Sequence, residues 1–332
     1  MTGAGLTCGD YLIQVIVLVL KLVFGLVFGF AVLLIALGGL GHVLRLRADP
    51  PFQMLAVEGE RRLHVQCEGP SEAPLVIYDA GAFGMYTDGW WVLQQLKQDH
   101  RVCLYDRAGM GWSDALPRDV SPTPDWHVED LRRLRDALGE ATPFVLIGHS
   151  MAGLRLHAYA NDYPEELRGL VFVDAARPQS MDVERVRGLV PWLRRALSLS
   201  TGFARIGLAG GVSYVLPDEL DLPAQQLQDK RRSISAVSHH KATRAELLAA
   251  FEAWPEASWR QETGAEQLPV FVFSNSQNGG TNAPVARAAQ ANTGIGGITA
   301  LPDETHVSLL NQANAEKIAQ AVRDITGQAS DD

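Results

Sequence analysis

The segment Phe144–Gly153 constrains the fold more than any other part of this sequence. An apolar run, Phe144–Ile147, leads into Gly148-His149-Ser150-Met151-Ala152, and a helical pattern follows. Small residues two positions before and two positions after Ser150 let a strand and a helix approach closely around a sharp turn, which pushes the serine side chain out above a sheet. The segment therefore predicts a strand, a tight turn with an exposed hydroxyl, and a helix in direct succession.

The chain after about residue 52 alternates strand-like and helical patterns. Short apolar runs predict strands at residues 54–57, 63–67, 75–78, 102–105, 144–147, 170–173, 270–273 and 298–301. The first two runs have no helix between them and predict a hairpin. Helical stretches are predicted at 90–98, 127–138, 154–161 and 307–325. This alternation predicts an α/β fold with a mostly parallel eight-stranded sheet and helices on both faces.

Residues 178–267 interrupt this alternation. They contain several helical patterns and no clear strand. An insertion of that length between two strands predicts a helical cap or lid. We therefore divide the chain into an N-terminal helix over 11–46, a core over 52–177 and 268–328, and a cap over 178–267.

The N-terminal region predicts a transmembrane helix. Residues 11–40 are almost wholly apolar, and residues 22–40 carry no charge; a bilayer core requires about 20 such residues in a helix. A cleaved signal peptide fits poorly, because no Lys or Arg precedes the run, the run is too long, and no small-residue cleavage site follows. Since His42, Arg45 and Arg47 follow the run, the positive-inside rule predicts a single-pass membrane protein whose catalytic part is cytoplasmic.

Three residues within this helix bear on its orientation and partners. Lys21 can extend toward the N-terminal membrane face, which weakens the charge asymmetry. Gly25 and Gly29 form a GxxxG pair that allows two helices to pack closely as a homodimer, although glycine is also frequent in membrane helices for other reasons. The sequence therefore predicts the lipid bilayer as a partner and leaves a homodimer open.

Composition excludes several classes of protein. The chain has 332 residues, is 47% hydrophobic and carries a net charge of −9, which disfavours disorder and general nucleic-acid binding. Its three cysteines, Cys8, Cys67 and Cys103, are too few for a disulfide framework and lack zinc-binding spacing. Cys103 lies in an apolar run and is expected in the core. We expect no metal and no cofactor.

Several segments together resemble the α/β-hydrolase fold superfamily. The turn at Ser150 has the G-x-S-x-G pattern with Ala152 in place of the last glycine. Residues 102–114 are similar to the loop after the fourth strand, Ala80-Gly81-Ala82 stands where members more often carry His-Gly, and Thr305-His306 follows the last strand. The resemblance covers nearly everything after about residue 53 and implies a nucleophilic Ser150. Haloalkane dehalogenases and epoxide hydrolases share the fold but use an aspartate nucleophile, which sets this chain apart from them.

The resemblance implies His306 as the catalytic base. A serine hydroxyl needs an adjacent base, and the family order places the histidine last, in a loop between a strand and a helix. Asp303 and Glu304 precede this histidine closely, and Asp303 is kept as a reserve candidate for the acid.

The catalytic acid is expected at Asp174. Most members carry the acid after the strand that here is 270–273, but the following loop contains no carboxylate. Asn275 or Asn278 in that loop can orient a histidine, although an amide stabilises its charge less well. Asp174 follows the preceding strand, a position that some members use, so we prefer it.

The resemblance also implies an oxyanion hole. Its donors are the backbone N–H of Met151 and that of Ala82, with Phe83 as the alternative to Ala82. Asp106 and Arg107 are expected to form a structural salt bridge beside the site.

Three further histidines are assigned structural or surface positions. His149 is expected to be structural within the turn. His239 and His240 lie in the predicted cap, where their adjacency disfavours a shared metal, and they are expected to face solvent.

The segment Arg185–Arg205 carries five arginines and no acid among apolar residues. This pattern predicts either a basic amphipathic surface lying on anionic lipid or a helix whose apolar side covers the site. The expected function is a membrane-anchored serine hydrolase, a carboxylesterase or lipase, that cleaves lipophilic esters through an acyl-enzyme on Ser150. Two alternatives stay open: an amidase or peptidase on the same residues, and a non-catalytic binding module, which the missing carboxylate after Phe273 would suit.

Overall fold

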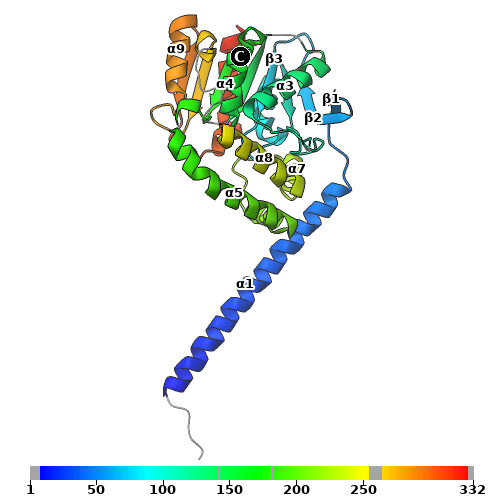
Figure 1. Cartoon of the computed structure of the whole chain (residues 1–332), viewed down its shortest axis with the longest axis vertical. Helices are drawn as coiled ribbons and strands as arrows, with labels where there is room; N and C mark the ends of the chain where they lie inside the picture. Colours follow the sequence, from blue (N-terminus) through cyan, green and yellow to red (C-terminus); the bar gives the residue numbers. More distant parts are fainter. Residues whose placement is uncertain (1–7, 118, 141–142, 181, 254–263, 328–332) are drawn as a thin grey trace, which may run out of the picture.

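The computed structural model describes residues 8–117, 119–140, 143–180, 182–253 and 264–327. Figure 1 shows a globular part attached to one long helix that extends away from it. Residues 181 and 254–263 of the predicted cap, and residue 328 of the predicted core, lie outside the described residues.

An eight-stranded sheet forms the centre of the globular part, in the order β1-β2-β4-β3-β5-β6-β7-β8. Its strands are β1 (Gln53–Glu58), β2 (Arg61–Glu68), β3 (Leu75–Asp79), β4 (Arg101–Tyr105), β5 (Phe144–His149), β6 (Leu167–Val173), β7 (Val270–Ser274) and β8 (Gly296–Ala300). β2 pairs antiparallel with both β1 and β4, and all other neighbours are parallel. The predicted fold, a mostly parallel sheet with an N-terminal hairpin, is confirmed.

The central strands are buried on both faces. β3 and β5 are buried along their whole length, because helices cover both sides of a parallel sheet, and such strands therefore form continuous apolar runs. One core cluster joins α3 (Pro124–Leu138), α4 (Ala152–Asp162) and α9 (Ala283–Thr293) to one face. A second cluster joins α2 (Trp90–Leu96) and α10 (Gln312–Thr326) to the other. α9 was not among the predicted helices, since its alanine-rich sequence offers little apolar contrast.

Local signals fix the ends of these helices. α3 begins after Thr123, whose side chain accepts a hydrogen bond from the Trp126 N–H, and it ends at Gly139 with a φ of 70°. α10 begins after Asn311, whose side chain caps the Asn314 N–H, and it ends at Gly327 with a φ of 73°. Glycine adopts this left-handed conformation without the steric penalty of a Cβ atom.

Among the described residues between β6 and β7, four α-helices lie in the segment predicted as a cap. They are α5 (Val183–Arg205), α6 (Leu208–Val215), α7 (Ala224–Ile234) and α8 (Val237–Ala253). Short 3-10 helices are η1 (Tyr86–Gly89), η2 (Pro164–Glu166), η3 (Pro178–Ser180), η6 (Ala265–Gln267) and η7 (Ser308–Leu310).

The N-terminal helix α1 (Cys8–Leu46) is long and apolar enough to cross a membrane. Its segment Ile13–Leu44 has a mean hydropathy of 2.8. Its C-terminal part packs against α6 through glycines: a Cβ atom on Gly38 would lie 1.6 Å from the carbonyl oxygen of Gly207. Gly25 and Gly29 have open space around them, and a homodimer through them stays a prediction.

A disulfide joins β2 to β4. Cys67 and Cys103 are directly paired in the antiparallel register and form an S–S bond. Cys103 is fully buried, as expected, but it is bonded rather than free. The sequence did not reveal the pair, because its members are 36 residues apart and meet only through the pairing of β2 with β4.

A partly buried carboxylate links η2 to α3 and α4. The Glu166 side chain accepts hydrogen bonds from Arg132, Arg135 and Tyr159. Burial raises the pKa of the Glu166 carboxyl, but these three donors outweigh it and lower that pKa to about 2. A carboxylate with a lowered pKa stabilises the fold above its unfolded pKa and loses that contribution as the pH falls toward its folded pKa.

We expect Glu166→Gln to lower the free energy of unfolding at pH 7 by about 2 kcal/mol. The difference from wild type should shrink as the pH falls from about 4.5 toward 2. Thermal unfolding of the detergent-solubilised protein across this pH range measures it, with the exposed neighbour Glu165→Gln as the control. A pH-independent difference would show that the carboxylate charge contributes nothing.

Candidate active site

Ser150 lies on a strained turn between β5 and α4. Its φ is 54°, a left-handed conformation that costs a non-glycine residue free energy and persists only where surrounding contacts hold it. The Ser150 N–H donates to the carbonyl of Val173 (3.2 Å), and the Ser150 carbonyl accepts from the N–H of Ala176 (2.8 Å) and of Gly153 (3.1 Å). The last residue of β6 and the backbone just after it therefore hold the turn on both sides.

The small residues around this serine are required by close approach. A Cβ atom on Gly148 would lie 2.5 Å from the Leu156 side chain, and one on Gly153 would lie 2.1 Å from the Ala176 carbonyl oxygen. Ala152 is fully buried in the core, so a single methyl group fits there. The strand, the turn and the helix occur in the predicted order.

Asp174 and His306 meet at the same edge of the sheet. Asp174 follows β6 directly, and His306 lies in the loop after β8. The Nδ1 atom of His306 is 2.6 Å from Oδ2 of Asp174. Among the described residues, no hydrogen bond joins His306 to Asn275, Asn278 or Asp303. The geometry thus pairs the histidine with the preferred acid candidate.

Ser274 is a site residue that the sequence reasoning missed. It is the last residue of β7, and its hydroxyl donates to Oδ1 of Asp174 (3.1 Å). Both carboxylate oxygens of Asp174 are therefore hydrogen-bonded. The signal was present, because Ser274 stands at the strand end where most members of the resembling superfamily carry their acid.

The surroundings keep Asp174 ionised. Burial raises the pKa of its carboxyl, but the hydrogen bond and charge of His306, together with the Ser274 hydroxyl, outweigh burial and leave that pKa below its usual value. A carboxylate that stays ionised at neutral pH can hold the Nδ1–H of an imidazole and stabilise the imidazolium ion.

Ser150, Asp174 and His306 line one open cavity of about 530 Å³. Ala175, Ala176, Ser274, Ser276, Gly280 and Thr281 complete the lining. Within the described residues, no hydrogen bond joins Ser150 to His306. Such bonds are often long until a substrate binds, and the imidazole side chain, which is 46% exposed, has room to move toward the hydroxyl.

His149 packs against the ring of His306. The two ring centroids are 4.5 Å apart, and Nε2–H of His149 donates to the backbone carbonyl of His306 (2.9 Å). Burial, and next the nearby His306, lower the pKa of His149 to about 4. A neutral ring at this position supports His306 without adding a competing positive charge. The expected structural role therefore includes a direct contact with the candidate base.

The candidate oxyanion donors Ala82 and Met151 belong to one apolar cluster. Both pack, with Phe83, against Leu197 of α5 and against Leu247 and Leu248 of α8. Ala82 follows Gly81 in the turn that the Gly84 N–H closes onto the Gly81 carbonyl (3.0 Å). The loop after β3 and the start of α4 thus share a cover made by the inserted helices.

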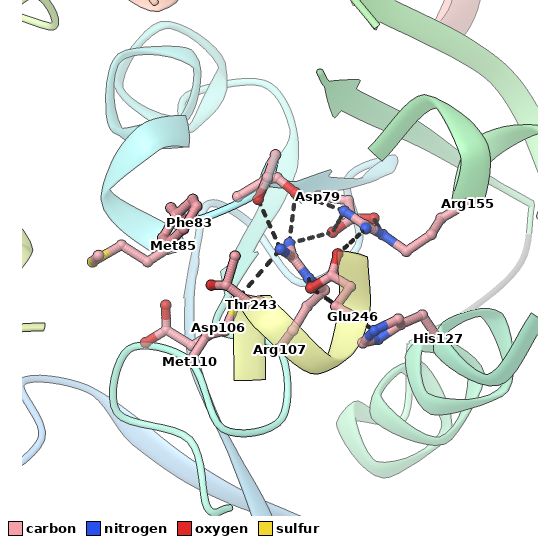
Figure 2. Close-up of polar contacts among 12 residues, drawn as sticks. Asp79, Phe83, Met85, Asp106, Arg107, Met110, His127, Arg155, Thr243 and Glu246 are labelled. Carbon is pink, nitrogen blue, oxygen red and sulfur yellow. Dashed lines mark hydrogen bonds and ion pairs between the residues drawn. The ribbon is translucent and has the colours of Figure 1, made fainter. Parts of the chain in front are cut away.

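Two buried arginines hold the loop after β3. Figure 2 shows Arg107 and Arg155 between Asp79 and Glu246. Arg107 donates to the carbonyl oxygens of Ala80 (2.5 Å) and Gly81 (2.7 Å), and Arg155 also donates to the Ala80 carbonyl (2.6 Å). Because these carbonyls directly precede Ala82, the arginines fix the orientation of its peptide group.

Carboxylates from two elements hold these arginines. Asp79 at the end of β3 accepts from Arg107 (3.2 Å) and Arg155 (2.5 Å), and Glu246 of α8 accepts from the same two side chains. The predicted Asp106–Arg107 salt bridge is wrong. Asp106 instead pairs with His64 (2.9 Å) and accepts from backbone N–H groups, because the turn at Gly111 brings the chain back onto its carboxylate.

The expectation that His239 and His240 face solvent is also wrong. Both are buried, because α8 packs against the loops after β3 and β4. His239 accepts from the Gly111 N–H (3.2 Å) through Nδ1 and donates to the Phe83 carbonyl (3.0 Å) through Nε2. Burial, and next the neighbouring His240, lower the pKa of His239 to about 4, which keeps this bridge neutral.

The sheet, the strained serine turn and the histidine–aspartate pair define an α/β protein of the hydrolase class. The chain matches the family described as alpha/beta hydrolase fold over residues 74–292, and it belongs to that family. The fold and membership of the α/β-hydrolase superfamily are therefore established.

Three comparisons illustrate the range of relatives. The chain is 29% identical to a mouse (lyso)-N-acylphosphatidylethanolamine lipase over 41% of this chain and 40% of the lipase. It is 30% identical to mouse epoxide hydrolase 4 over 35% of this chain and 32% of that protein. A thermophilic esterase from Thermogutta terrifontis aligns with a TM-score of 0.56 at 19% identity, covering 83% of this chain and 97% of the esterase. The match thus spans less than half the length of these two curated relatives, and the esterase likeness shows the fold alone.

We expect Glu246→Gln to destabilise the protein by about 3 kcal/mol, because it leaves two buried guanidinium groups with one carboxylate. The exposed Glu252→Gln, on the same helix and paired with Arg194, should change stability by less than about 0.5 kcal/mol. Unfolding of the solubilised proteins measures both. Equal effects would mean that the buried cluster is not needed to hold α8.

Proposed function

We propose that this protein is a membrane-anchored serine hydrolase that cleaves lipophilic carboxylic esters. The observation that carries the proposal is the placement of Ser150, on a strained turn, in one cavity with the hydrogen-bonded His306 and Asp174. A nucleophile, a base and a group that orients the base are what acyl transfer through a serine requires.

In the proposed first step, Oγ of Ser150 attacks the ester carbonyl carbon while Nε2 of His306 takes the hydroxyl proton. Asp174 holds Nδ1–H and stabilises the imidazolium ion that forms. The backbone N–H groups of Met151 and Ala82 donate to the developing oxyanion. The imidazolium then gives its proton to the departing alcohol, which leaves an acyl group on Ser150.

In the second step, His306 takes a proton from water, and the resulting hydroxide attacks the acyl carbon. Collapse of the second tetrahedral intermediate returns the proton to Oγ of Ser150 and releases the carboxylic acid. No redox partner or metal is needed for this balance, since only proton transfers and acyl transfers take place.

Ester chemistry is supported over epoxide opening by the identity of the nucleophile. Ser150 stands where the resembling epoxide hydrolases use an aspartate, and no carboxylate replaces it on the turn. The lipase relative agrees with acyl transfer, and the apolar cluster over Ala82 and Met151 suits a lipophilic substrate.

The anchor in this proposal is α1, and its orientation is inferred from two opposing signals. The basic residues after the apolar run favour a cytoplasmic globular part. The Cys67–Cys103 disulfide favours an oxidising compartment, because cytosolic thiols are kept reduced. A disulfide between two core strands depends directly on the redox state of its compartment, whereas Lys21 weakens the charge asymmetry that the positive-inside rule uses. We therefore replace the cytoplasmic expectation with a globular part on the oxidising side.

Thiol counting tests this orientation. Protein taken from cells, denatured and alkylated with a polymer-linked maleimide should react at Cys8 alone, and at all three cysteines after reduction. Reaction of all three cysteines without reduction would contradict this orientation and support a cytoplasmic globular part.

Substitutions test the catalytic assignment. Ser150→Ala should abolish labelling by a fluorophosphonate probe and lower ester turnover by about 10⁴-fold or more. His306→Ala should cause a similar loss, and Asp174→Asn a loss of about 10³- to 10⁴-fold in kcat. Ser274→Ala should cost about tenfold, because it removes one hydrogen bond to a charged group. A panel of esters of increasing chain length measures turnover.

Asn275→Ala and Asn278→Ala serve as matched controls, because both lie in the loop after β7, and each should keep wild-type turnover. Wild-type turnover in Asp174→Asn would contradict the acid assignment. Absence of fluorophosphonate labelling on folded wild-type protein would instead favour a non-catalytic binding module.

A further inference from the structure

The helix α5 carries a second apolar face that no described residue covers. Its inner face is buried through Val186, Leu197, Thr201 and Ala204. Its outer face exposes large apolar side chains that recur every three to seven residues, which we call the cap stripe: Leu189, Trp192, Leu199, Phe203 and Ile206. Trp192 is 67% exposed and Leu199 is 60% exposed. A row of large, exposed apolar side chains along one helix is typical of an interaction surface.

The cap stripe ends next to the helix that is apolar enough to cross a membrane. α5 leads through Gly207 into α6, and α6 packs on α1. A Cβ atom on Gly211 would lie 1.9 Å from the Leu34 carbonyl oxygen, so the backbones touch. Figure 1 shows α5 running along the underside of the globular part toward α1, which continues away beyond this contact.

The length of α1 that stays uncovered matches a bilayer. Packing against α6 begins at Leu34, which is 6% exposed, while nearly all described apolar side chains from Ile13 to Leu33 are exposed. At 1.5 Å per residue, residues 13–33 span about 31 Å, close to the roughly 30 Å hydrocarbon core. The contact with α6 therefore falls at the membrane boundary, and the C-terminal end of the cap stripe falls there with it.

Charge complements this placement. Arg185, Arg187, Arg194, Arg195 and Arg205 are exposed along α5. Arg187 pairs with Glu184 and Arg194 with Glu252; the other three make no ion pair with the described residues. Arginines near an apolar stripe suit the boundary between anionic headgroups and acyl chains.

We propose that the cap stripe lies in the headgroup–acyl boundary of the membrane that α1 crosses, so that the protein contacts the bilayer at two places. This inference rests on the anchor in the proposed function. The inner face of α5 touches Ala82, Phe83 and Met151 through the Leu193–Leu197 side, so one helix separates the lipid from the candidate oxyanion loop. Ester substrates dissolved in the bilayer then have a short route to Ser150, which water-soluble esters do not need.

Tryptophan quenching tests the contact without using activity. The full chain is reconstituted in phosphatidylcholine–phosphatidylglycerol vesicles that contain phospholipid brominated near the headgroup end of its acyl chain. The difference in emission between wild type and Trp192→Phe gives the contribution of Trp192. Brominated lipid should quench this contribution at least twofold, and aqueous iodide should quench it little. The contribution of Trp126, measured with Trp126→Phe on the core helix α3, should not be quenched by the lipid.

Each other outcome overturns the inference in a distinguishable way. Quenching of Trp192 by iodide alone would place the stripe in water. Shielding from both quenchers would indicate that a second copy covers it. Release of the protein from vesicles by alkaline carbonate would also contradict the membrane anchor of the proposed function. Resistance to carbonate with unquenched Trp192 would contradict only the contact between the cap stripe and the bilayer.

A substrate split extends the test to function. Phe203→Glu should lower turnover of a long-chain ester embedded in vesicles by about tenfold and leave a water-soluble acetate ester unchanged. Ser198→Glu adds the same charge to an exposed position of α5 without removing an apolar side chain, and it should retain more than half of wild-type turnover on both. An equal loss on both esters in Phe203→Glu, or no loss on either, would contradict the route through the bilayer.

Discussion

The backbone at Ser150 holds a conformation that a free chain avoids, and the rest of the site is arranged around that turn. Its positive φ is maintained by hydrogen bonds to the Val173 carbonyl and from the Ala176 N–H. The same segment after β6 carries Asp174, itself at a φ of 39°. The strain at the serine and the position of the acid are therefore fixed by one contact between adjacent parallel strands.

On the other side of the site, a buried charge cluster holds the loop after β3 in place. Arg107 and Arg155 bond to the carbonyls of Ala80 and Gly81, and Glu246 draws α8 onto the same arginines. His239 adds a second bond from α8 to the Phe83 carbonyl. The loop that would stabilise an oxyanion is thus held by an inserted helix as well as by the sheet. A displacement of α8 would also disturb this loop, because a buried charge that loses its partner destabilises the fold.

The sequence predicted the fold well because its signals were local. Apolar runs with intervening helical patterns indicated the parallel sheet, and the small residues around Ser150 indicated the turn. The partners of buried polar groups were harder to predict. Arg107 bonds to Asp79 and Glu246, far away in sequence, rather than to the adjacent Asp106. The Cys67–Cys103 bond depended in the same way on which strands pair.

Position in the fold explains why the acid could be assigned and its helper could not. Asp174 was the carboxylate at a strand end known to suit a histidine, whereas Ser274 stood at the strand end where a carboxylate was sought, and its hydroxyl was therefore passed over. The sequence also did not distinguish the two apolar faces of α5, since apolar residues of both faces interleave with arginines. Only the packing of one face against Leu247 and Leu248 shows that the other is uncovered by the described residues.

The central claim is that Ser150 forms the covalent intermediate. Rapid mixing of the full-length protein with a p-nitrophenyl ester, acid quenching within the first turnover and peptide mass mapping would test it most directly. The account predicts one acyl group per chain, on the peptide that contains Ser150, with a matching burst of nitrophenolate. Steady turnover with the acyl group on another residue, or with no acylated peptide at any time, would contradict it.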